Sequence, residues 1–145
     1  MNKTVSIVFS FALITTLAFA AGQKKAAVDF KKLETKDLKK GKGRAAKTGD
    51  SISVLYIGKF KDGKVFDSNM DEKYKAKGEP FSLRLGMHQV IAGWEKGLVG
   101  AQEGTIRQLN IPWSLAYGER GYPGAIPPKT DLVFIVKVVE VTVGK

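Results

Sequence analysis

Residues 86–100 read GMHQVIAGWEKGLVG, and this stretch carries the one good helical signal after the first twenty residues. Ile91, Trp94 and Leu98 recur at helical spacing on one face, and a glycine stands at each end of the run. The pattern predicts a helix of about two turns over residues 91–99. No other segment beyond the first twenty residues has comparable helical character, so the rest of the domain has to be built from strands and loops.

Three segments rich in β-branched residues predict the strands of one sheet. Residues 51–57 and 105–111 alternate partly between apolar and polar side chains, and residues 132–143 are dominated by Val and Ile. The Asp-Gly pair within residues 61–64 predicts a tight hairpin turn, since this dipeptide readily adopts positive φ angles. We therefore expect an α+β fold in which a twisted antiparallel β-sheet wraps around one short α-helix.

The size and composition of the chain limit the kinds of site it can form. A chain of 145 residues with 43% hydrophobic content is long enough for one domain with one core. Two long loops, at 68–80 and 117–130, lie between the predicted elements, and loops of this length are usually functional or mobile. The chain has no cysteine, which excludes disulfides. It has one histidine, His88, and a single histidine cannot assemble a metal site. We expect no cofactor and no metal, and we expect His88 to be exposed and without a role.

Basic residues gather in one part of the chain. Ten of the 24 Lys and Arg residues lie between residues 21 and 47 with three acidic residues, whereas residues 48–145 are almost neutral. A basic stretch can bind an anionic surface such as membrane headgroups or nucleic acid. It can equally be a solvated tail with a charged edge strand. The second interpretation is favoured, and no nucleic-acid partner is expected, because the stretch has Phe30 as its one aromatic residue and so lacks the aromatic interleaving that nucleic-acid binders use to stack bases.

The first twenty residues predict an export signal. Lys3 precedes an almost uninterrupted apolar run over residues 5–19, and small residues stand at both positions that a signal peptidase reads. Cleavage after Ala20 would leave a flexible leader at 21–27 and a domain at 28–145. An uncleaved membrane anchor needs about 20 apolar residues, and the serines and threonines in this run favour the cleaved signal. We expect a periplasmic or secreted protein without a stable membrane span.

Five short strings hold aromatic and branched apolar side chains but no phosphate-binding loop: VFDS at 65–68, VIAGW at 90–94, AYG at 116–118, GYPGAIPP at 121–128 and LVF at 132–134. In order, spacing and identity they resemble the FKBP-type peptidyl-prolyl cis-trans isomerases, in a short exported bacterial form, from about residue 28 to the C-terminus. The resemblance implies the fold inferred above. It also implies a monomer, because the long helical dimerisation segment of some exported relatives has no counterpart before this domain.

The resemblance further implies an apolar pocket with a few polar groups. Substrate would be bound by Tyr56, Phe66, Phe81, Val90, Ile91, Trp94, Phe134 and, from the flap over the pocket, Tyr122 and Ile126. Trp94 would form the floor. The Ile91 backbone N–H and the Tyr117 hydroxyl would donate to substrate carbonyls, and Asp67 would direct a negative charge into the pocket. Taken singly, an inward Trp or Phe is more often plain core, and Asp67 beside a serine suits a turn; only their combination favours a site.

The expected activity is acceleration of cis/trans exchange at Xaa-Pro bonds in the folding of exported proteins. Such a pocket would act by desolvation and by fitting the twisted transition state, without acid, base or nucleophile. The expected partners are proline-containing unfolded or nascent polypeptides, and macrolide inhibitors could occupy the same pocket. Two alternatives remain open: a chaperone that holds unfolded chains in this cleft without turnover, and a surface or secreted interaction factor that uses the basic stretch.

Overall fold

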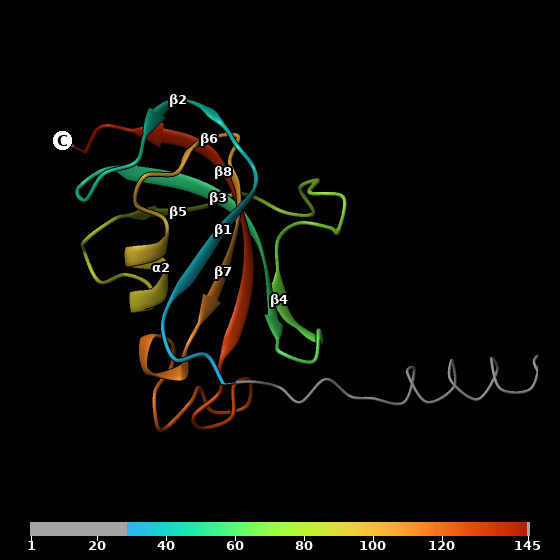
Figure 1. Cartoon of the computed structure of the whole chain (residues 1–145). Coiled ribbons are helices and arrows are strands. Elements are labelled where there is room, and N and C mark those ends of the chain that lie inside the picture. Colours follow the sequence, from blue (N-terminus) through green and yellow to red (C-terminus); the bar gives the residue numbers. More distant parts are fainter. Residues whose placement is uncertain (1–28, 145) are drawn as a thin grey trace, which may run out of the picture.

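The computed structural model describes residues 29–144, so the predicted signal peptide at 1–20 and the leader at 21–27 lie outside the described residues. The described chain forms, in order, β1 (Glu34–Lys39), β2 (Lys42–Ala45), β3 (Ser51–Phe60), β4 (Val65–Ser68), β5 (Phe81–Arg84), α2 (Ala92–Gly97), β6 (Gln102–Glu103), β7 (Ile106–Ile111), a 3-10 turn η1 (Trp113–Leu115) and β8 (Leu132–Thr142). All the strand pairings are antiparallel. The predicted α+β fold, a twisted antiparallel sheet with one short α-helix, is confirmed for this part of the chain (Figure 1).

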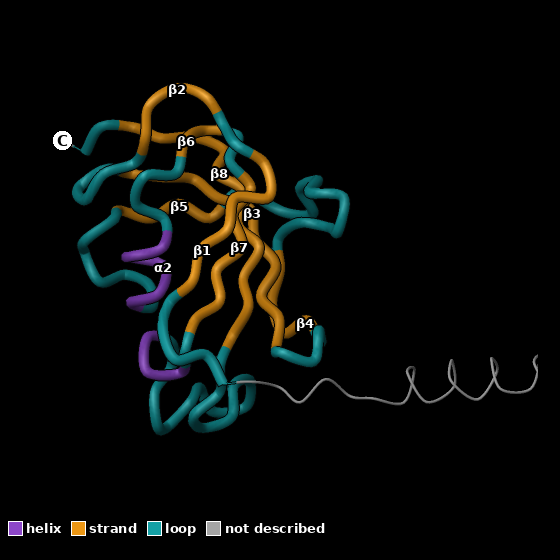
Figure 2. Tube along the Cα trace, in the orientation of Figure 1, coloured by secondary structure: helices purple, strands orange, loops and turns teal. Residues whose placement is uncertain are grey.

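The main sheet has the order β1-β7-β8-β3-β4, and β5 also pairs with β3. Its centre is the long ladder between β3 and β8, which runs from Ser51 opposite Thr142 to Phe60 opposite Leu132. Strand β3 has two further partners, because its first residues pair with β5 and its last residues pair with β4. Strands β2 and β6 form a separate two-stranded sheet. The long strands bend around the helix, as the tube in Figure 2 shows.

The main core lies between α2 and the sheet. Alternate residues of the strands, among them Val54, Leu109 and Val136, are fully buried together with Leu98 just after the helix. The helix approaches the sheet closely because two of its residues are glycines. A Cβ on Gly93 would lie 2.5 Å from Cγ2 of Ile111, and one on Gly97 would lie 2.8 Å from Cδ2 of Leu109. Both distances are shorter than real Cβ contacts, so glycine at these positions sets how deep the helix side chains reach.

The helix is shorter than predicted, while its position is as expected. The sequence predicts residues 91–99, and the structure has Ala92–Gly97. Ile91 has an extended ψ of 149° and stands before the first turn, and Leu98 stands after the last. No helix within residues 29–144 is long and apolar enough to cross a membrane.

The three predicted strands are confirmed as β3, β7 and β8, and the predicted hairpin at 61–64 is confirmed between β3 and β4. In that hairpin the N–H of Gly63, at φ 92°, donates to the Phe60 carbonyl at 2.9 Å. Strands β2, β4, β5 and β6 were not predicted. Strand β1 is exposed at all six positions and lies at the edge of the sheet beside β7, which agrees with the interpretation of part of the basic stretch as a charged edge strand.

The opposite face of the sheet carries a second, smaller apolar cluster. Leu55 and Ile57, which alternate with the core residues of β3, contact the buried Met70 there, and Tyr74 packs against them. Met70 and Tyr74 belong to the long loop after β4. In Figure 1 this loop lies on the side of the sheet opposite α2. Two residues of the predicted loop at 68–80, Met70 and Tyr74, therefore pack on the outer face, while most of the loop is exposed.

Candidate functional site

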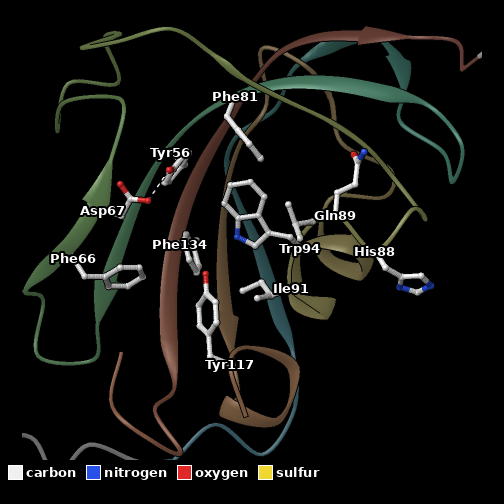
Figure 3. Close-up of a pocket in the computed structure, with 11 residues that line it drawn as sticks. Tyr56, Phe66, Asp67, Phe81, His88, Gln89, Ile91, Trp94, Tyr117 and Phe134 are labelled. Atoms are coloured by element: carbon white, nitrogen blue, oxygen red, sulfur yellow. Dashed lines mark hydrogen bonds between the residues drawn. The ribbon is translucent and has the colours of Figure 1, made fainter. Parts of the chain in front are cut away.

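An open pocket of about 440 Å³ lies between the start of the helix, strands β3, β4 and β8, and the loop before β8. It is lined by Tyr56, Phe66, Asp67, Phe81, His88, Gln89, Val90, Ile91, Trp94, Tyr117 and Phe134. Figure 3 shows these side chains arriving from several different elements around one hollow. Nine of the eleven residues that the sequence predicted for the site therefore lie in one wall, although they are spread from β3 to β8 along the chain.

Aromatic rings form most of this wall. Trp94 is only 4% exposed, and its ring lies 5.3 Å from that of Tyr56 and 5.3 Å from that of Phe134, in both cases edge to face. Phe66 meets Phe134 in the same manner at 5.6 Å, and Phe81 lies 6.3 Å from Trp94. Edge-to-face arrangements are a favoured geometry of aromatic pairs, so these rings stabilise one another and give the hollow an apolar floor.

A glycine in β3 makes room for part of this ring cluster. A Cβ on Gly58 would lie 2.6 Å from Cζ of Phe66 and 2.9 Å from Cε1 of Phe134. Gly58 is opposite Asp67 in one neighbouring strand and Phe134 in the other. The missing side chain thus lets Phe66 fold across β3 onto Phe134.

The carboxylate of the pocket is held by a phenol. The Tyr56 hydroxyl donates to Oδ2 of Asp67 at 2.7 Å, as the dashed line in Figure 3 shows. Burial raises the pKa of Tyr56 well above its ordinary range, and the hydrogen bond to Asp67 and the negative charge of that carboxylate raise it further. Tyr56 therefore stays protonated and fixes one carboxylate oxygen. Oδ1 of Asp67 has no hydrogen-bond partner among residues 29–144.

Some hydrogen-bond donors at the pocket have no acceptor in the described part of the chain. The buried indole N–H of Trp94 is among them, and two further donors belong to the margin of the pocket. The Tyr117 hydroxyl is one; burial, followed by the charge of Asp67, raises the pKa of Tyr117 above its ordinary value, so the hydroxyl keeps its proton. The backbone N–H of Ile91 is the other. It precedes the first turn of α2, where the earliest N–H groups of a helix have no internal partner. Both residues line the pocket and can donate to a carbonyl placed in it.

The loop before β8 is tied down at its base by a buried carboxylate. Asp131 accepts hydrogen bonds from the N–H groups of Phe30 at 2.8 Å and Trp113 at 2.9 Å, and from Lys61 at 3.2 Å. Burial by itself would raise the pKa of Asp131, but these two N–H donors and the Lys61 ammonium outweigh it and hold the pKa below the ordinary value. The carboxylate stays ionised and positions the segment that presents Tyr117.

Two residues predicted to bind substrate are absent from the pocket wall. Ile126 is 5% exposed and belongs to the main core, and Tyr122 is 58% exposed. The reason is that the flap folds on itself: Tyr122 and Ile126 form a bridge, with the Ile126 N–H donating to the Tyr122 carbonyl at 2.8 Å. Tyr122 contributes indirectly, because its ring meets that of Tyr117 at 5.7 Å.

Two residues to which the sequence gave no role lie on the pocket rim. His88 is exposed as expected, yet it is part of the lining, and its φ of 55° is unusual for a residue other than glycine. Gln89 beside it accepts a hydrogen bond from the Arg84 N–H at 2.8 Å. Their position directly before Val90 and Ile91 was the only available signal.

The chemistry of the pocket is binding chemistry. It brings together an apolar floor, hydrogen-bond donors without an acceptor and one partly engaged carboxylate, and its lining contains no Ser, Thr, Cys or Lys. Within residues 29–144 no group of three or more His, Cys, Asp or Glu side chains is arranged to hold a metal ion. The fold and site thus define a small β-sheet protein with a preformed peptide-sized aromatic hollow.

Comparison with known proteins agrees with this description. The model of the FKBP-type peptidyl-prolyl cis-trans isomerase family matches residues 42–139. FK506-binding protein 4 of Neurospora crassa is 51% identical over 105 residues, which are 72% of this chain and 21% of that protein. FK506-binding protein 4 of Aspergillus fumigatus is 44% identical over 113 residues, 78% of this chain and 22% of that protein. FK506-binding protein 3 of Dictyostelium discoideum is 40% identical over 143 residues, 97% of this chain and 68% of that protein.

The chain belongs to the FKBP-type peptidyl-prolyl cis-trans isomerase family. It spans about a fifth of the length of the two fungal relatives and about two thirds of the Dictyostelium one. The family predicted from the sequence is therefore confirmed. The narrower expectation of a short exported bacterial form finds no support in these eukaryotic relatives.

Proposed function

We propose that this protein catalyses cis/trans isomerisation of Xaa-Pro bonds in polypeptides. The observation that carries the proposal is the composition of the pocket: an edge-to-face aromatic floor centred on Trp94, with the Ile91 N–H and the Tyr117 hydroxyl free at its margin. Isomerisation makes and breaks no covalent bond, so it requires no nucleophile. Family membership supports the same reaction.

The reaction is slow in water because rotation about the Xaa-Pro bond disrupts amide resonance, with a barrier of about 18–20 kcal/mol. In the twisted transition state the carbonyl is less dipolar than in the planar ground state, and water therefore stabilises it less. A hollow that excludes water from the amide removes this preference for the planar form. Only interactions that are stronger with the twisted form than with the planar form accelerate the step.

The residues of the pocket divide this work. The prolyl ring would lie on Trp94, with Tyr56 and Phe134 on either side of it. The Ile91 N–H and the Tyr117 hydroxyl would donate to carbonyls of the peptide and so fix the chain on both sides of the rotating bond. Asp67, oriented by the Tyr56 hydroxyl at 2.7 Å, would present its free oxygen to the twisted amide. Its negative charge would stabilise the charge distribution that the amide has in the twisted transition state.

A refolding assay tests the proposal. Substoichiometric protein should accelerate a refolding reaction limited by proline isomerisation, which otherwise takes tens to hundreds of seconds. Asp67→Ala and Trp94→Ala should weaken the acceleration in proteins whose circular dichroism is unchanged. Glu140→Ala is the matched control for the loss of a carboxylate, because Glu140 is exposed on β8 and does not line the pocket.

The competing function is holding without turnover, since Phe81 and Met87 are exposed apolar side chains at or near the pocket. Under that function only equimolar protein would help refolding, and Asp67→Ala would behave as wild type. If only equimolar protein helps and both Asp67→Ala and Trp94→Ala match the wild type, the holding function replaces the isomerase proposal.

Four further parts of the proposal concern export, substrates, oligomeric state and inhibitor binding. We expect export with cleavage after Ala20, because residues 1–20 have the composition of a signal sequence; mass spectrometry that finds Met1 on the folded product would reject it. We expect periplasmic or secreted proline-containing polypeptides as substrates and a monomer in sedimentation. A macrolide such as FK506, named for the relatives, should compete with peptide for the pocket.

A further inference from the structure

Along the edge opposite β8, strand β3 changes its hydrogen-bonding partner in the middle of the pocket wall. Residues Ser51–Val54 pair with β5, and Ile57–Lys59 pair with β4. Leu55 and Tyr56 lie between the two ladders, so neither β4 nor β5 pairs with Tyr56. This gap matters because Tyr56 supplies both a ring of the floor and the hydroxyl that holds Asp67.

Asn69 fills the gap, and it does so largely with its side chain. Its Oδ1 accepts a hydrogen bond from the Tyr56 N–H at 2.6 Å, and its Nδ2 donates to the carbonyls of Val54 at 3.3 Å and Glu79 at 3.1 Å. Its own backbone N–H donates to the Tyr56 carbonyl at 3.1 Å. One amide side chain thus joins β3 to both ends of the loop that separates β4 from β5.

These hydrogen bonds reach three pocket residues. Tyr56 is held directly at its backbone. Asp67 stands two residues before Asn69, at the end of β4, and Phe81 stands two residues after Glu79, at the start of β5. The ring of Phe81 lies 6.5 Å from that of Tyr56. The side-chain amide of Asn69 therefore connects the three segments that carry Tyr56, Asp67 and Phe81 on one side of the pocket.

The loop that carries Asn69 is itself anchored on the outer face of the sheet. Met70, the next residue, is 1% exposed in the second apolar cluster. The Lys137 ammonium donates to the Tyr74 carbonyl at 3.1 Å, and the Lys77 N–H donates to the Asn69 carbonyl at 2.9 Å. Contacts on the outer face of the sheet thus hold the segment that carries Asn69 in place.

We propose that Asn69 is a positioning residue for catalysis: its side-chain amide sets the place of Tyr56 and, through the Tyr56 hydroxyl, the orientation of the Asp67 carboxylate. The inference rests on the proposed isomerase function. The ordinary alternative is that Asn69 ends one ladder and contributes to stability alone. If Asn69 contributes to stability alone, removing its amide lowers the melting temperature and leaves the kcat of the folded protein unchanged. If Asn69 positions Tyr56 and Asp67, removing its amide lowers kcat in the folded protein. Trp94 and Phe134 stand on α2 and β8, so the floor of the pocket stays in place in both cases.

Asn69→Ala should therefore lower kcat more than it raises KM. We expect a fall of about tenfold in kcat/KM, since small displacements of catalytic groups are costly. Asn69→Asp keeps an oxygen for the Tyr56 N–H but sets a second oxygen against the carbonyls of Val54 and Glu79. It should keep more activity than Asn69→Ala even where its melting temperature is lower, and it carries the test if the alanine variant does not fold.

A double-mutant cycle with Tyr56→Phe separates positioning from stability. If Asn69 acts through the Tyr56 hydroxyl, Asn69→Ala costs clearly less in the Tyr56→Phe background than in the wild type, since contacting residues are not additive. Gln102→Ala is the control: its amide donates to the Gly43 carbonyl at 2.7 Å, in the separate β2–β6 sheet, and its loss should leave activity unchanged.

The outcomes distinguish this inference from the function on which it rests. An active wild type with unchanged kcat in folded Asn69→Ala overturns the inference alone, as does strict additivity with Tyr56→Phe. Higher activity in Asn69→Ala than in Asn69→Asp at equal folding also overturns it. A wild type without isomerase activity removes the proposed function, and the positioning role falls with it.

Discussion

The hydrogen bond between Tyr56 and Asp67 gives the sharpest prediction, because one atom can be removed without disturbing the aromatic wall. Tyr56→Phe deletes the hydroxyl that donates to Asp67 at 2.7 Å. The phenyl ring can keep the edge-to-face contact at 5.3 Å with Trp94 and the tilted contact at 6.4 Å with Phe134. The pocket should therefore hold its shape while the carboxylate loses its orientation.

The size of the effect follows from the kind of bond. A hydrogen bond to a charged acceptor contributes about 1.5–3 kcal/mol. Asp67 is exposed, so water partly replaces the phenol on the free carboxylate, and the lower end of the range applies. About 1.4 kcal/mol corresponds to tenfold in rate. We expect kcat/KM to fall by at most about tenfold, with the larger part in kcat, because only the part of the bond energy that is specific to the twisted form affects the rate. The free energy of unfolding should fall by no more than the lower end of the same range.

Exchange spectroscopy by NMR on a short Xaa-Pro peptide measures the rate directly, without a denaturant. Tyr74→Phe is the matched control, because it removes a phenol hydroxyl on the opposite face of the sheet, beside Met70. Wild-type kcat/KM in a folded Tyr56→Phe protein would show that the orientation of Asp67 plays no part in the reaction. An equal loss in Tyr74→Phe would show that the effect is general destabilisation.

Three other predictions concern stability and pH. Gly58→Ala should lower the free energy of unfolding in urea by about 1–3 kcal/mol, because its Cβ would lie 2.6 Å from Cζ of Phe66; wild-type stability would contradict the packing described. Asp131→Asn should cost stability mainly above pH 3.8, the ordinary pKa of the group, since a lowered pKa stabilises the fold only where the unfolded carboxyl is ionised. The gap to wild type should close as the pH falls, and a gap that persists in acid would refute the reasoning. Tyr117→Phe should reduce kcat/KM, and because the pKa of Tyr117 is raised above 10.0, the alkaline loss of wild-type activity should lie above pH 10; a midpoint below it would count against the hydroxyl as the donor.

The elements that the sequence predicted are those whose burial leaves a pattern. Strand β8 is buried at alternate positions along most of its length, and its Val and Ile residues gave a clear signal. Strand β1 reads ETKDLK and is exposed throughout. It forms because it pairs with β7, about 70 residues further along the chain, as Asp37 and Arg107 do. The lysines of the segment suggested an edge strand, but no local property indicates its bounds or its partner.

The pocket was predictable for a different reason. Trp94, Asp67 and Tyr117 stand in short motifs that resemble a known family, and the structure brings all three together. The flap was less predictable, because Ile126 is drawn into the core by its bridge with Tyr122. Asn69 lies outside every motif string. Its proposed positioning role follows only from the structure, in which its side chain bridges the gap at Leu55 and Tyr56 between the two ladders of β3.

Catalysis and holding share the same apolar hollow, so only the polar groups can separate them. A surface that merely holds unfolded chains needs exposed apolar area, which Phe81 and Met87 already provide. It has no need for a carboxylate whose one oxygen is fixed by Tyr56 while the other stays free. Tyr56→Phe leaves the apolar rings in place and releases only the carboxylate. If turnover falls while equimolar suppression of aggregation persists, the orientation of Asp67 is what makes an isomerase out of a binding cleft.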